Sequence, residues 1–333
     1  MANDISSAGP SPEFFRGQGF GASFKRAFFA TRPKFFTASI LPVLVGTALG
    51  AKALSESQGT IPWHLAILAL LATVLVHAAS NVLNDVGDDI SGADGASPGR
   101  IYPFTGGSRF IQAGILSRRE MTRLGIGLVV AAMAIGLLLV LERGIGVVWM
   151  GVAGIALATL YSLPRVYLVA RGLGEISIAI AFGVLPVCGA AWLLDGHFDL
   201  GRFLVGIPVG MWVALILVIN EVPDLAGDAA AGKRTLVVRW GVPGTRALYI
   251  GLHVVSLAAS IGAIALGELA AWYLLPAALI MAGGVKAALG IVDLAVQDET
   301  LPVRRAQVQK CIELTLAVQA IGSLAVIAAI AFR

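Results

Sequence analysis

The sequence predicts an all-α protein that crosses a membrane several times. Hydrophobic residues make up 57% of the chain and charged residues only 13%, whereas soluble domains carry about 25% charged residues. The mean hydropathy is +0.85. Apolar runs of about 20 residues, the length that spans a bilayer as a helix, recur from Phe35 to Phe332 without a linker-like break. We therefore expect one transmembrane domain, residues 35–333, after a polar tail.

The tail, residues 1–34, is basic and aromatic. Its phenylalanines alternate with Lys and Arg, and it lacks the uninterrupted apolar stretch of a cleavable signal peptide. Apolar rings mixed with basic groups suit an amphipathic helix lying in the membrane interface. We expect such a helix near residues 21–31.

Nine apolar segments follow the tail. Gly and Pro occur inside several of them, which membrane helices tolerate. The segments are roughly 35–54, 61–83, 121–141, 145–163, 173–194, 201–221, 244–266, 270–292 and 308–331.

Lys and Arg are distributed unevenly around these segments. Most of the 24 fall in the tail and in the loops on its side, and only Lys52, Arg143, Arg202 and Arg333 fall on the other side. Because cytoplasmic loops are enriched in Lys and Arg, this bias predicts nine helices with a cytoplasmic N-terminus. The net charge of +4 then reflects loops that face anionic lipid, and no nucleic-acid partner is expected.

Two short acidic windows interrupt the apolar pattern, each at the end of a segment that runs toward the cytoplasmic side. They share the spacing N-x3-D-x3-D and consist of Asn81, Asp85 and Asp89, then of Asn220, Asp224 and Asp228. Residues four apart share one face of a helix, so each window presents a column of amide and carboxylate groups.

Carboxylates at this spacing repel one another unless a cation lies between them. Mg2+ takes hard oxygen ligands, commonly one or two carboxylates, and completes its shell with water and phosphate oxygens. Two facing columns are suited to two Mg2+ ions bridged by a diphosphate, with Lys233, Arg234, Arg100 and Arg109 as further cationic partners. The alternative is that the acids are solvated loop residues that balance nearby arginines.

These motifs resemble the UbiA superfamily of intramembrane aromatic prenyltransferases. Asn84-Asp85-Val86-Gly87-Asp88 is similar to its N-D-x-x-D motif, and Asp224 to Asp228 to its D-x-x-x-D motif. Gly92, Asp94 and the run GKRTLVVRWG from Gly232 to Gly241 resemble the branch that prenylates 1,4-dihydroxy-2-naphthoate in menaquinone biosynthesis.

Four further stretches are similar to the family. They are Arg32-Pro33, Gly106-Gly107-Ser108-Arg109, Tyr161-Ser162-x-Pro164 and Gly172-Leu173-Gly174-Glu175. The sequence departs from the naphthoate branch at Glu221-Val222-Pro223, where Pro223 is expected to bend the chain.

The resemblance implies nine helices around a central cavity and a Mg2+-dependent transfer of a polyprenyl group from its diphosphate to an aromatic quinone precursor. It implies a multi-pass protein of a bacterial or archaeal cytoplasmic membrane. One Mg2+ ion is assigned to Asp85 and Asp88, with Asn84 completing the shell, and a second ion to Asp224 and Asp228.

The diphosphate is assigned to cationic groups and the remaining polar residues to supporting positions. The diphosphate-binding residues are Arg32, Arg109, Lys233 and Arg234, and Lys233 is also counted as catalytic. The supporting or substrate-binding residues are Asn81, Asp89, Asp94, Tyr161 and Asn220. His77, one turn before Asn81, is either a base for the acceptor or a helix-packing residue.

Two alternatives remain open. The acceptor could be 4-hydroxybenzoate, homogentisate or a lipid headgroup. An ion-coupled secondary transporter could also carry paired acidic half-sites, although such sites usually lie near the bilayer midplane and these lie at helix ends.

Overall fold

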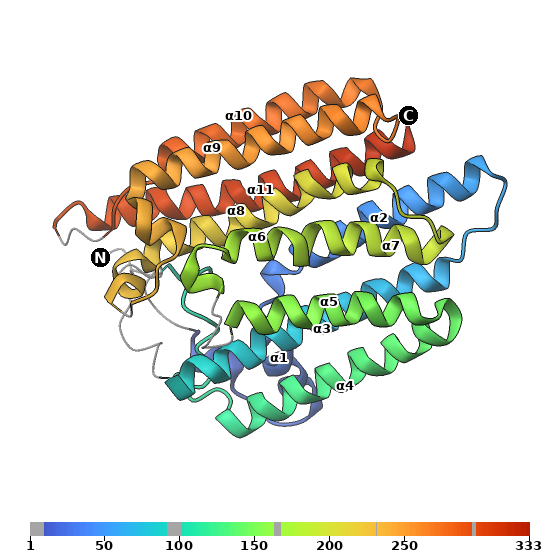
Figure 1. Cartoon of the computed structure of the whole chain (residues 1–333). Coiled ribbons are helices and arrows are strands. Elements are labelled where there is room, and N and C mark those ends of the chain that lie inside the picture. Colours follow the sequence, from blue (N-terminus) through green and yellow to red (C-terminus); the bar gives the residue numbers. More distant parts are fainter. Residues whose placement is uncertain (1–9, 92–100, 163–167, 231, 295–297) are drawn as a thin grey trace.

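The computed structural model describes residues 10–91, 101–162, 168–230, 232–294 and 298–333. Asp94, Gly92 and Arg100, three residues singled out above, lie outside these ranges. The described residues form helices and no strand, as the sequence predicts. Figure 1 shows long helices lying side by side with alternating direction.

The N-terminal half contains two short helical turns, one amphipathic helix and four long helices. These are η1 (Pro12–Phe15), α1 (Phe20–Ala30), η2 (Pro33–Phe35), α2 (Thr37–Glu56), α3 (Trp63–Ser91), α4 (Arg118–Arg143) and α5 (Ile145–Ser162).

The C-terminal half begins with a broken helix and ends with four further helices. The elements are η4 (Leu168–Arg171), α6 (Gly174–Ala179), the π-helical turn η5 (Ile180–Val184), α7 (Leu185–Asp195), α8 (Leu200–Ala230), α9 (Leu236–Ala265), η6 (Ala271–Tyr273), α10 (Leu274–Gly290) and α11 (Leu301–Ala331).

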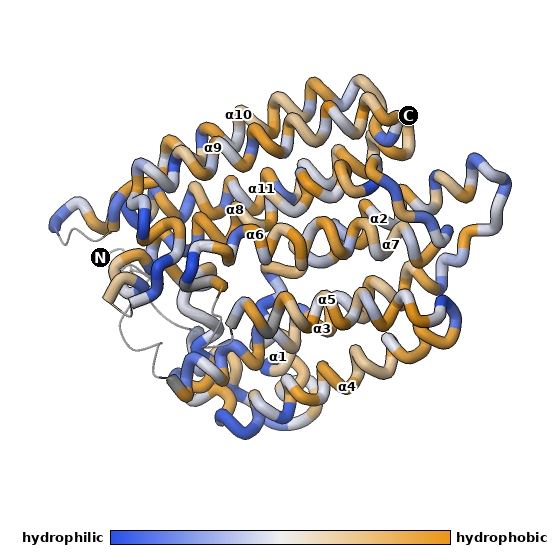
Figure 2. The backbone as a smooth tube through the Cα atoms, in the orientation of Figure 1, coloured by the Kyte–Doolittle hydropathy of each residue, from blue (hydrophilic) through white to orange (hydrophobic). Residues whose placement is uncertain are grey.

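Within the described residues, eight helical segments are long and apolar enough to cross a membrane. The broken helix α6–α7 counts as one of them, Gly174–Asp195. α5 is not among the eight, because its described apolar part, Ile145–Leu157, is shorter. The chain is therefore a multi-pass membrane protein, and the ninth crossing stays a prediction. Figure 2 shows hydrophobic residues along the helices and hydrophilic ones gathered toward their ends.

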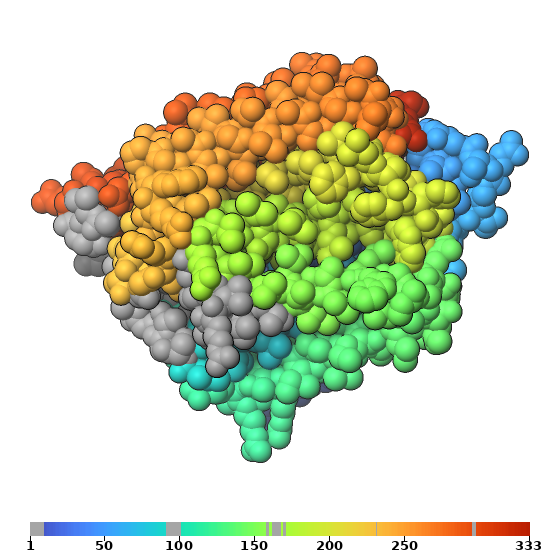
Figure 3. Space-filling model, viewed as in Figure 1, coloured from blue at the N-terminus to red at the C-terminus, as the bar shows by residue number. Residues whose placement is uncertain are grey.

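Burial separates a central helix from peripheral ones. In its most apolar stretch, α8 has 67% of residues buried inside the protein, whereas α4 has 17%. α4 and α5 form one edge of the molecule and α9 and α10 the opposite edge (Figure 3). Because exposed side chains such as Ile126, Met133 and Leu141 cover α4, that edge faces lipid in a membrane.

Both acidic windows lie on helices and not in loops. α3 continues to Ser91 and α8 to Ala230, several residues beyond the ends of the predicted apolar segments. α8 also passes through Pro223 as one helix, so the expected bend does not end it. Membrane helices accommodate proline because neighbouring helices and side chains satisfy the freed carbonyl. Both helices end on the same side of the bundle (Figure 1).

The broken helix brings α6 close to α8. η5 precedes Pro186, which cannot donate a backbone hydrogen bond within the helix. At Gly183, a Cβ atom would lie 2.0 Å from the Cα atom of Gly210. Only glycine at this crossing allows the two backbones to meet, and the contact places the first turn of α6 beside the end of α8.

The amphipathic helix predicted in the tail is α1. Its Phe20, Phe24 and Phe28 are exposed by 87%, 61% and 43% and stack along one side of the helix. Three exposed rings in a row beside basic residues fit the predicted position in the membrane interface.

Candidate functional site

Asp85 is the most enclosed acid of the first window. It lies on α3 with 4% of its surface exposed. Its Oδ2 atom accepts a hydrogen bond of 2.9 Å from the backbone N–H of Ser108. Its Oδ1 atom is buried and has no hydrogen-bond partner among the described residues. A buried carboxylate oxygen without a donor is costly unless a cation or a proton completes it.

The loop over Asp85 has an unusual backbone. Gly106 and Gly107 have φ angles of 72° and 71°, and Arg109 follows at 58°. A Cβ atom on Gly107 would lie 2.7 Å from Oδ1 of Asp85, so glycine allows the loop to touch the carboxylate. Left-handed backbone is uncommon for a non-glycine residue and often marks a functional site.

Arg32 shares this conformation, with a φ angle of 58° at the entry to η2. Its Nη2 atom lies 3.5 Å from the carbonyl oxygen of Phe104, in the same loop, while its Nε atom is buried and unpartnered in the described structure. The structure thus places two of the predicted diphosphate-binding arginines, Arg32 and Arg109, on or against the loop that covers Asp85.

The other residues of the first window have different surroundings. Asn84 donates from Nδ2 to Oδ2 of Asp88 at 3.0 Å. Asn81 donates to the carbonyl oxygen of Thr31 at 2.9 Å and so links α3 to the residue before Arg32. Asp89 forms an ion pair with Nε of Arg118 at 2.6 Å. Asp89 therefore has a cationic partner on α4.

The second window lies on the last turns of α8. Asn220 and Asp224 are half-buried, and Oδ1 of Asn220 is buried without a hydrogen-bond partner among the described residues. Nζ of Lys233 lies 3.0 Å from Oδ1 of Asp228. The turn after α8 thus brings Lys233 to the window, as its place in the sequence predicts. Arg234 beside it is exposed.

Two buried glutamates adjoin the second window. Glu175 on α6 is 3% exposed and Glu221 on α8 is 7% exposed. Both oxygens of Glu175 and Oε2 of Glu221 are buried without a hydrogen-bond partner in the described structure. Glu221 lies near the like charges of Glu175 and Asp228, and Thr235 and Lys233 offset part of this repulsion.

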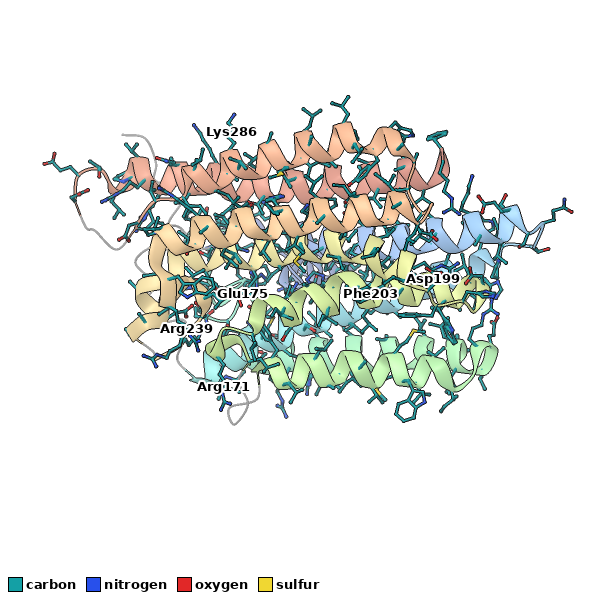
Figure 4. All side chains as sticks on the ribbon, turned by 45° about the horizontal axis from the view of Figure 1, so that its top comes forward. Arg171, Glu175, Asp199, Phe203, Arg239 and Lys286 are labelled. Atoms are coloured by element: carbon teal, nitrogen blue, oxygen red, sulfur yellow. The ribbon has the colours of Figure 1, made fainter. Side chains whose placement is uncertain are left out.

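The surroundings of Glu175 are basic on one side. Arg239 lies near its carboxylate and donates from Nη2 to the carbonyl oxygen of Arg171 at 2.9 Å. Figure 4 shows these three residues at one end of the bundle, whereas Asp199 and Phe203 lie toward the other end. The sequence singled out the stretches that contain Glu175 and Glu221 but did not predict that the two carboxylates are buried. Their burial follows from the contact between α6 and α8.

Tyr161 and His77, the two other residues singled out in the sequence, lie on α5 and α3. Tyr161 lies half-buried near the end of α5. His77 is buried on α3, its Nδ1 atom 2.5 Å from Oγ of Ser39. Its ring lies between the rings of Phe36 and Phe182, with centroid distances of 5.6 and 5.1 Å. These contacts describe a helix-packing histidine that also holds a polar partner inside the bundle.

The donor set fits Mg2+. Asp85 and Asn220 offer buried oxygens that lack donors, and carboxylate and amide oxygens are suitable ligands for this ion. Among the described side chains, no group of three acidic, His or Cys residues converges tightly enough to hold a metal alone. A Mg2+ site that is completed by water and phosphate oxygens does not require such a group.

The fold and the site together define a multi-pass membrane protein with acidic and basic groups gathered at one end of an apolar bundle. Residues 41–306 match the UbiA prenyltransferase family. Because the match covers most of the sequence, the chain belongs to this family.

Two bacterial relatives are similar over most of their length. The 1,4-dihydroxy-2-naphthoate octaprenyltransferase of Escherichia coli strain K12 is 34% identical over 236 residues, which cover 68% of this chain and 72% of the relative. The enzyme of the same name from Mycobacterium tuberculosis is 33% identical over 71% of this chain and 76% of its own length.

Solved structures share the fold at lower identity. A UbiA homolog from Aeropyrum pernix K1 in its apo form aligns with a TM-score of 0.63 and 21% identity, covering 89% of this chain and 98% of the homolog. A UbiA homolog from Archaeoglobus fulgidus bound to DMAPP and Mg2+ aligns with a TM-score of 0.58 and 17% identity, covering 89% of this chain and 99% of the homolog. These similarities support the helical architecture.

Proposed function

We propose that this protein transfers a polyprenyl group from polyprenyl diphosphate to 1,4-dihydroxy-2-naphthoate, as a step of menaquinone biosynthesis, with Mg2+ as cofactor. The proposal rests mainly on the surroundings of Asp85. Asp85 is a buried carboxylate at the end of a membrane helix, with one oxygen unpaired beneath a glycine loop that also presents Arg109. Such a carboxylate suits a cation that in turn binds an anionic leaving group.

The assigned roles follow from charge. Asp85 and Asp88, with Asn84, would hold one Mg2+ ion, and Asp224 and Asp228 would hold a second. Ions held there would neutralise charge that builds on the departing diphosphate. Of this chain's own residues, Arg109 and Arg32 bind diphosphate oxygens on the α3 side. Lys233 and Arg234 bind them on the α8 side.

The chemistry is a substitution at the first carbon of the donor. The bond between that carbon and the diphosphate oxygen breaks, and the oxygen keeps the electron pair. The electron-rich ring of the acceptor then forms the new carbon–carbon bond, and the attacked ring carbon regains aromaticity by losing its own substituent, a proton or the carboxyl group as CO2. Lys233 and the arginines act more strongly on the transition state than on the bound donor, because negative charge grows on the diphosphate as it leaves.

The apolar helices exclude water from the reacting carbon, which water would otherwise trap. A central cavity between the helices holds the isoprenoid chain and the acceptor. Asn81, Asp89, Asn220 and Tyr161 are assigned supporting or substrate-binding roles, and the same role for Asp94 rests on the sequence motif alone. The N-terminus and the acidic helix ends lie on the cytoplasmic side, in agreement with the distribution of Lys and Arg.

The naphthoate acceptor rests on two observations. The relatives at 33–34% identity carry that substrate in their names, and the sequence from Gly232 to Gly241, which contains Lys233, resembles the same branch. A direct test presents purified protein in lipid vesicles with labelled geranyl diphosphate, Mg2+ and one acceptor at a time: dihydroxynaphthoate, 4-hydroxybenzoate, homogentisate or a glycerophosphate headgroup.

The expected result is prenylated naphthoate, lost with EDTA and restored by added Mg2+. Transfer to another acceptor in preference would overturn the naphthoate assignment. Uptake of substrate into sealed vesicles without chemical conversion would support an ion-coupled transporter instead.

A further inference from the structure

The N-terminal turn, residues 12–17, is packed into the bundle although the tail around it is polar and basic. Phe15 on η1 is 7% exposed. It belongs to one buried cluster with Ala30, Val82, Val86, Phe110 and Met121. Its ring lies against that of Phe110, which is 2% exposed, at a centroid distance of 4.8 Å. On α1, Phe29 contacts the ring of Phe15 at a centroid distance of 5.6 Å, whereas Phe20, Phe24 and Phe28 stack on one another along the helix.

Basic side chains of α1 hold the turn in this position. Nη1 of Arg26 donates to the carbonyl oxygens of Phe15 at 3.3 Å and Gly17 at 3.1 Å. Nζ of Lys25 donates to the carbonyl oxygen of Phe14 at 2.7 Å. These contacts explain part of the alternation of basic and aromatic residues in the tail, which membrane attachment alone does not require.

Phe110 joins this cluster to the candidate site. It directly follows Arg109, and its backbone N–H lies 3.4 Å from Oγ of Ser108. The backbone N–H of Ser108 in turn donates to Asp85. The segment Gly107–Arg109 is therefore fixed at one end by Asp85 and at the other by Phe110, whose ring is held by Phe15.

We propose that Phe15 is a positioning residue of the donor site: through Phe110 it holds the segment Gly107–Arg109 against Asp85, so that the N-terminal turn forms part of the binding site for the prenyl diphosphate. The identity of the ligand rests on the proposed function. The contacts among Phe15, Phe110, Ser108 and Asp85 do not.

The test compares Phe15→Ala with Phe24→Ala. Phe24 lies on α1, is 61% exposed, and its ring contacts those of Phe20 and Phe28, away from Phe15 and Phe110. The measurements are Mg2+-dependent binding of geranyl diphosphate, the KM of each substrate and kcat. Phe15→Ala is expected to raise the Kd and KM of geranyl diphosphate about tenfold, because a displacement below 1 Å loosens Arg109 and Asp85 together. The KM of the acceptor and the values of Phe24→Ala are expected to remain those of the wild type.

Two further variants separate positioning from general loss of structure. Phe110→Ala should weaken donor binding to a similar degree, and the double variant should be little worse than either single one, because both remove the same contact. Phe15→Leu retains an apolar side chain and should recover most of the binding, which keeps the proposal testable if Phe15→Ala folds poorly.

Unchanged donor binding in Phe15→Ala or additive effects of Phe15→Ala and Phe110→Ala would overturn the proposal. So would an equal rise in the KM of both substrates. Failure of the wild-type protein to bind geranyl diphosphate with Mg2+ would instead contradict the proposed function, so the two failures are distinguishable.

Discussion

Gly107→Ala is predicted to displace the Asp85 carboxylate without removing any charged group from the site. The new methyl group would start 2.7 Å from Oδ1 of Asp85, and ordinary contacts of this kind begin near 3.4 Å. Because Oδ2 is tied to the backbone of Ser108, the carboxylate cannot turn away without lengthening that hydrogen bond. The loop or the carboxylate must therefore move by roughly 0.7 Å, the difference between these two distances.

The substitution Gly107→Ala is expected to lower both stability and activity. A left-handed backbone costs a non-glycine residue about 1–2 kcal/mol, which lowers the free energy of unfolding. The displacement itself acts on activity, since a misplacement of about 1 Å in a catalytic group can reduce the rate about 100-fold. We therefore expect kcat/KM to fall by about 10- to 100-fold and the Mg2+ concentration needed for half-maximal activity to rise.

Gly114→Ala is the matched control. Gly114 has a φ angle of 66° in the same loop region, but a Cβ atom there would meet nothing within 4 Å. Gly114→Ala therefore has the same energetic cost of a left-handed backbone but creates no contact with Asp85. Prenyl transfer and thermal unfolding are measured for both variants. Equal activity and equal Mg2+ dependence in the two would refute the reasoning.

Two further substitutions probe opposite ends of the bundle. Lys233→Met removes the cation 3.0 Å from Asp228 and is expected to raise the KM of the donor about 10- to 100-fold, because hydrogen bonds to charged groups contribute about 1.5–3 kcal/mol; an unchanged KM in steady-state kinetics would contradict this role. Arg202→Ala removes the buried partner of Asp195, which it contacts from Nη1 at 2.8 Å, and is expected to lower stability by about 3–5 kcal/mol. Thermal unfolding measures that loss, and a wild-type midpoint would show that the pair does not stabilise the fold.

The helical fold could be predicted from the sequence because a membrane span has a strong and simple signal. Apolar length alone located each long helix, and its ends differed from the prediction mainly where polar residues continue a helix beyond the bilayer. Asp85 and Asp224 are examples: both lie beyond the predicted apolar segments 61–83 and 201–221, yet α3 and α8 continue through them as helices.

The site was only partly predictable for a related reason. Local spacing identified the two windows and the cation that follows the second, Lys233. It could not distinguish Asp85, enclosed by a loop some twenty residues later, from Asp89, paired with Arg118. That distinction depends on how the loop folds back on α3.

The buried positions of Glu175 and Phe15 likewise follow from tertiary contacts. Neither residue carries a local signal of burial, since a glutamate in a polar turn and a phenylalanine in a basic tail are ordinary surface residues. Glu175 is buried because Gly183 allows α6–α7 to approach α8. Phe15 is buried because Arg26 fixes the N-terminal turn.

The two acidic helix ends, of α3 and α8, are proposed to act together on Mg2+ and a prenyl diphosphate. Calorimetric binding of geranyl diphosphate to the purified protein, with and without Mg2+, measures this without reference to the acceptor. Asp85→Asn and Asp224→Asn should each abolish Mg2+-dependent binding, whereas Asp298→Asn, a change at an acid exposed in the turn before α11, should leave it unchanged. Wild-type affinity in either of the first two variants would contradict the shared site.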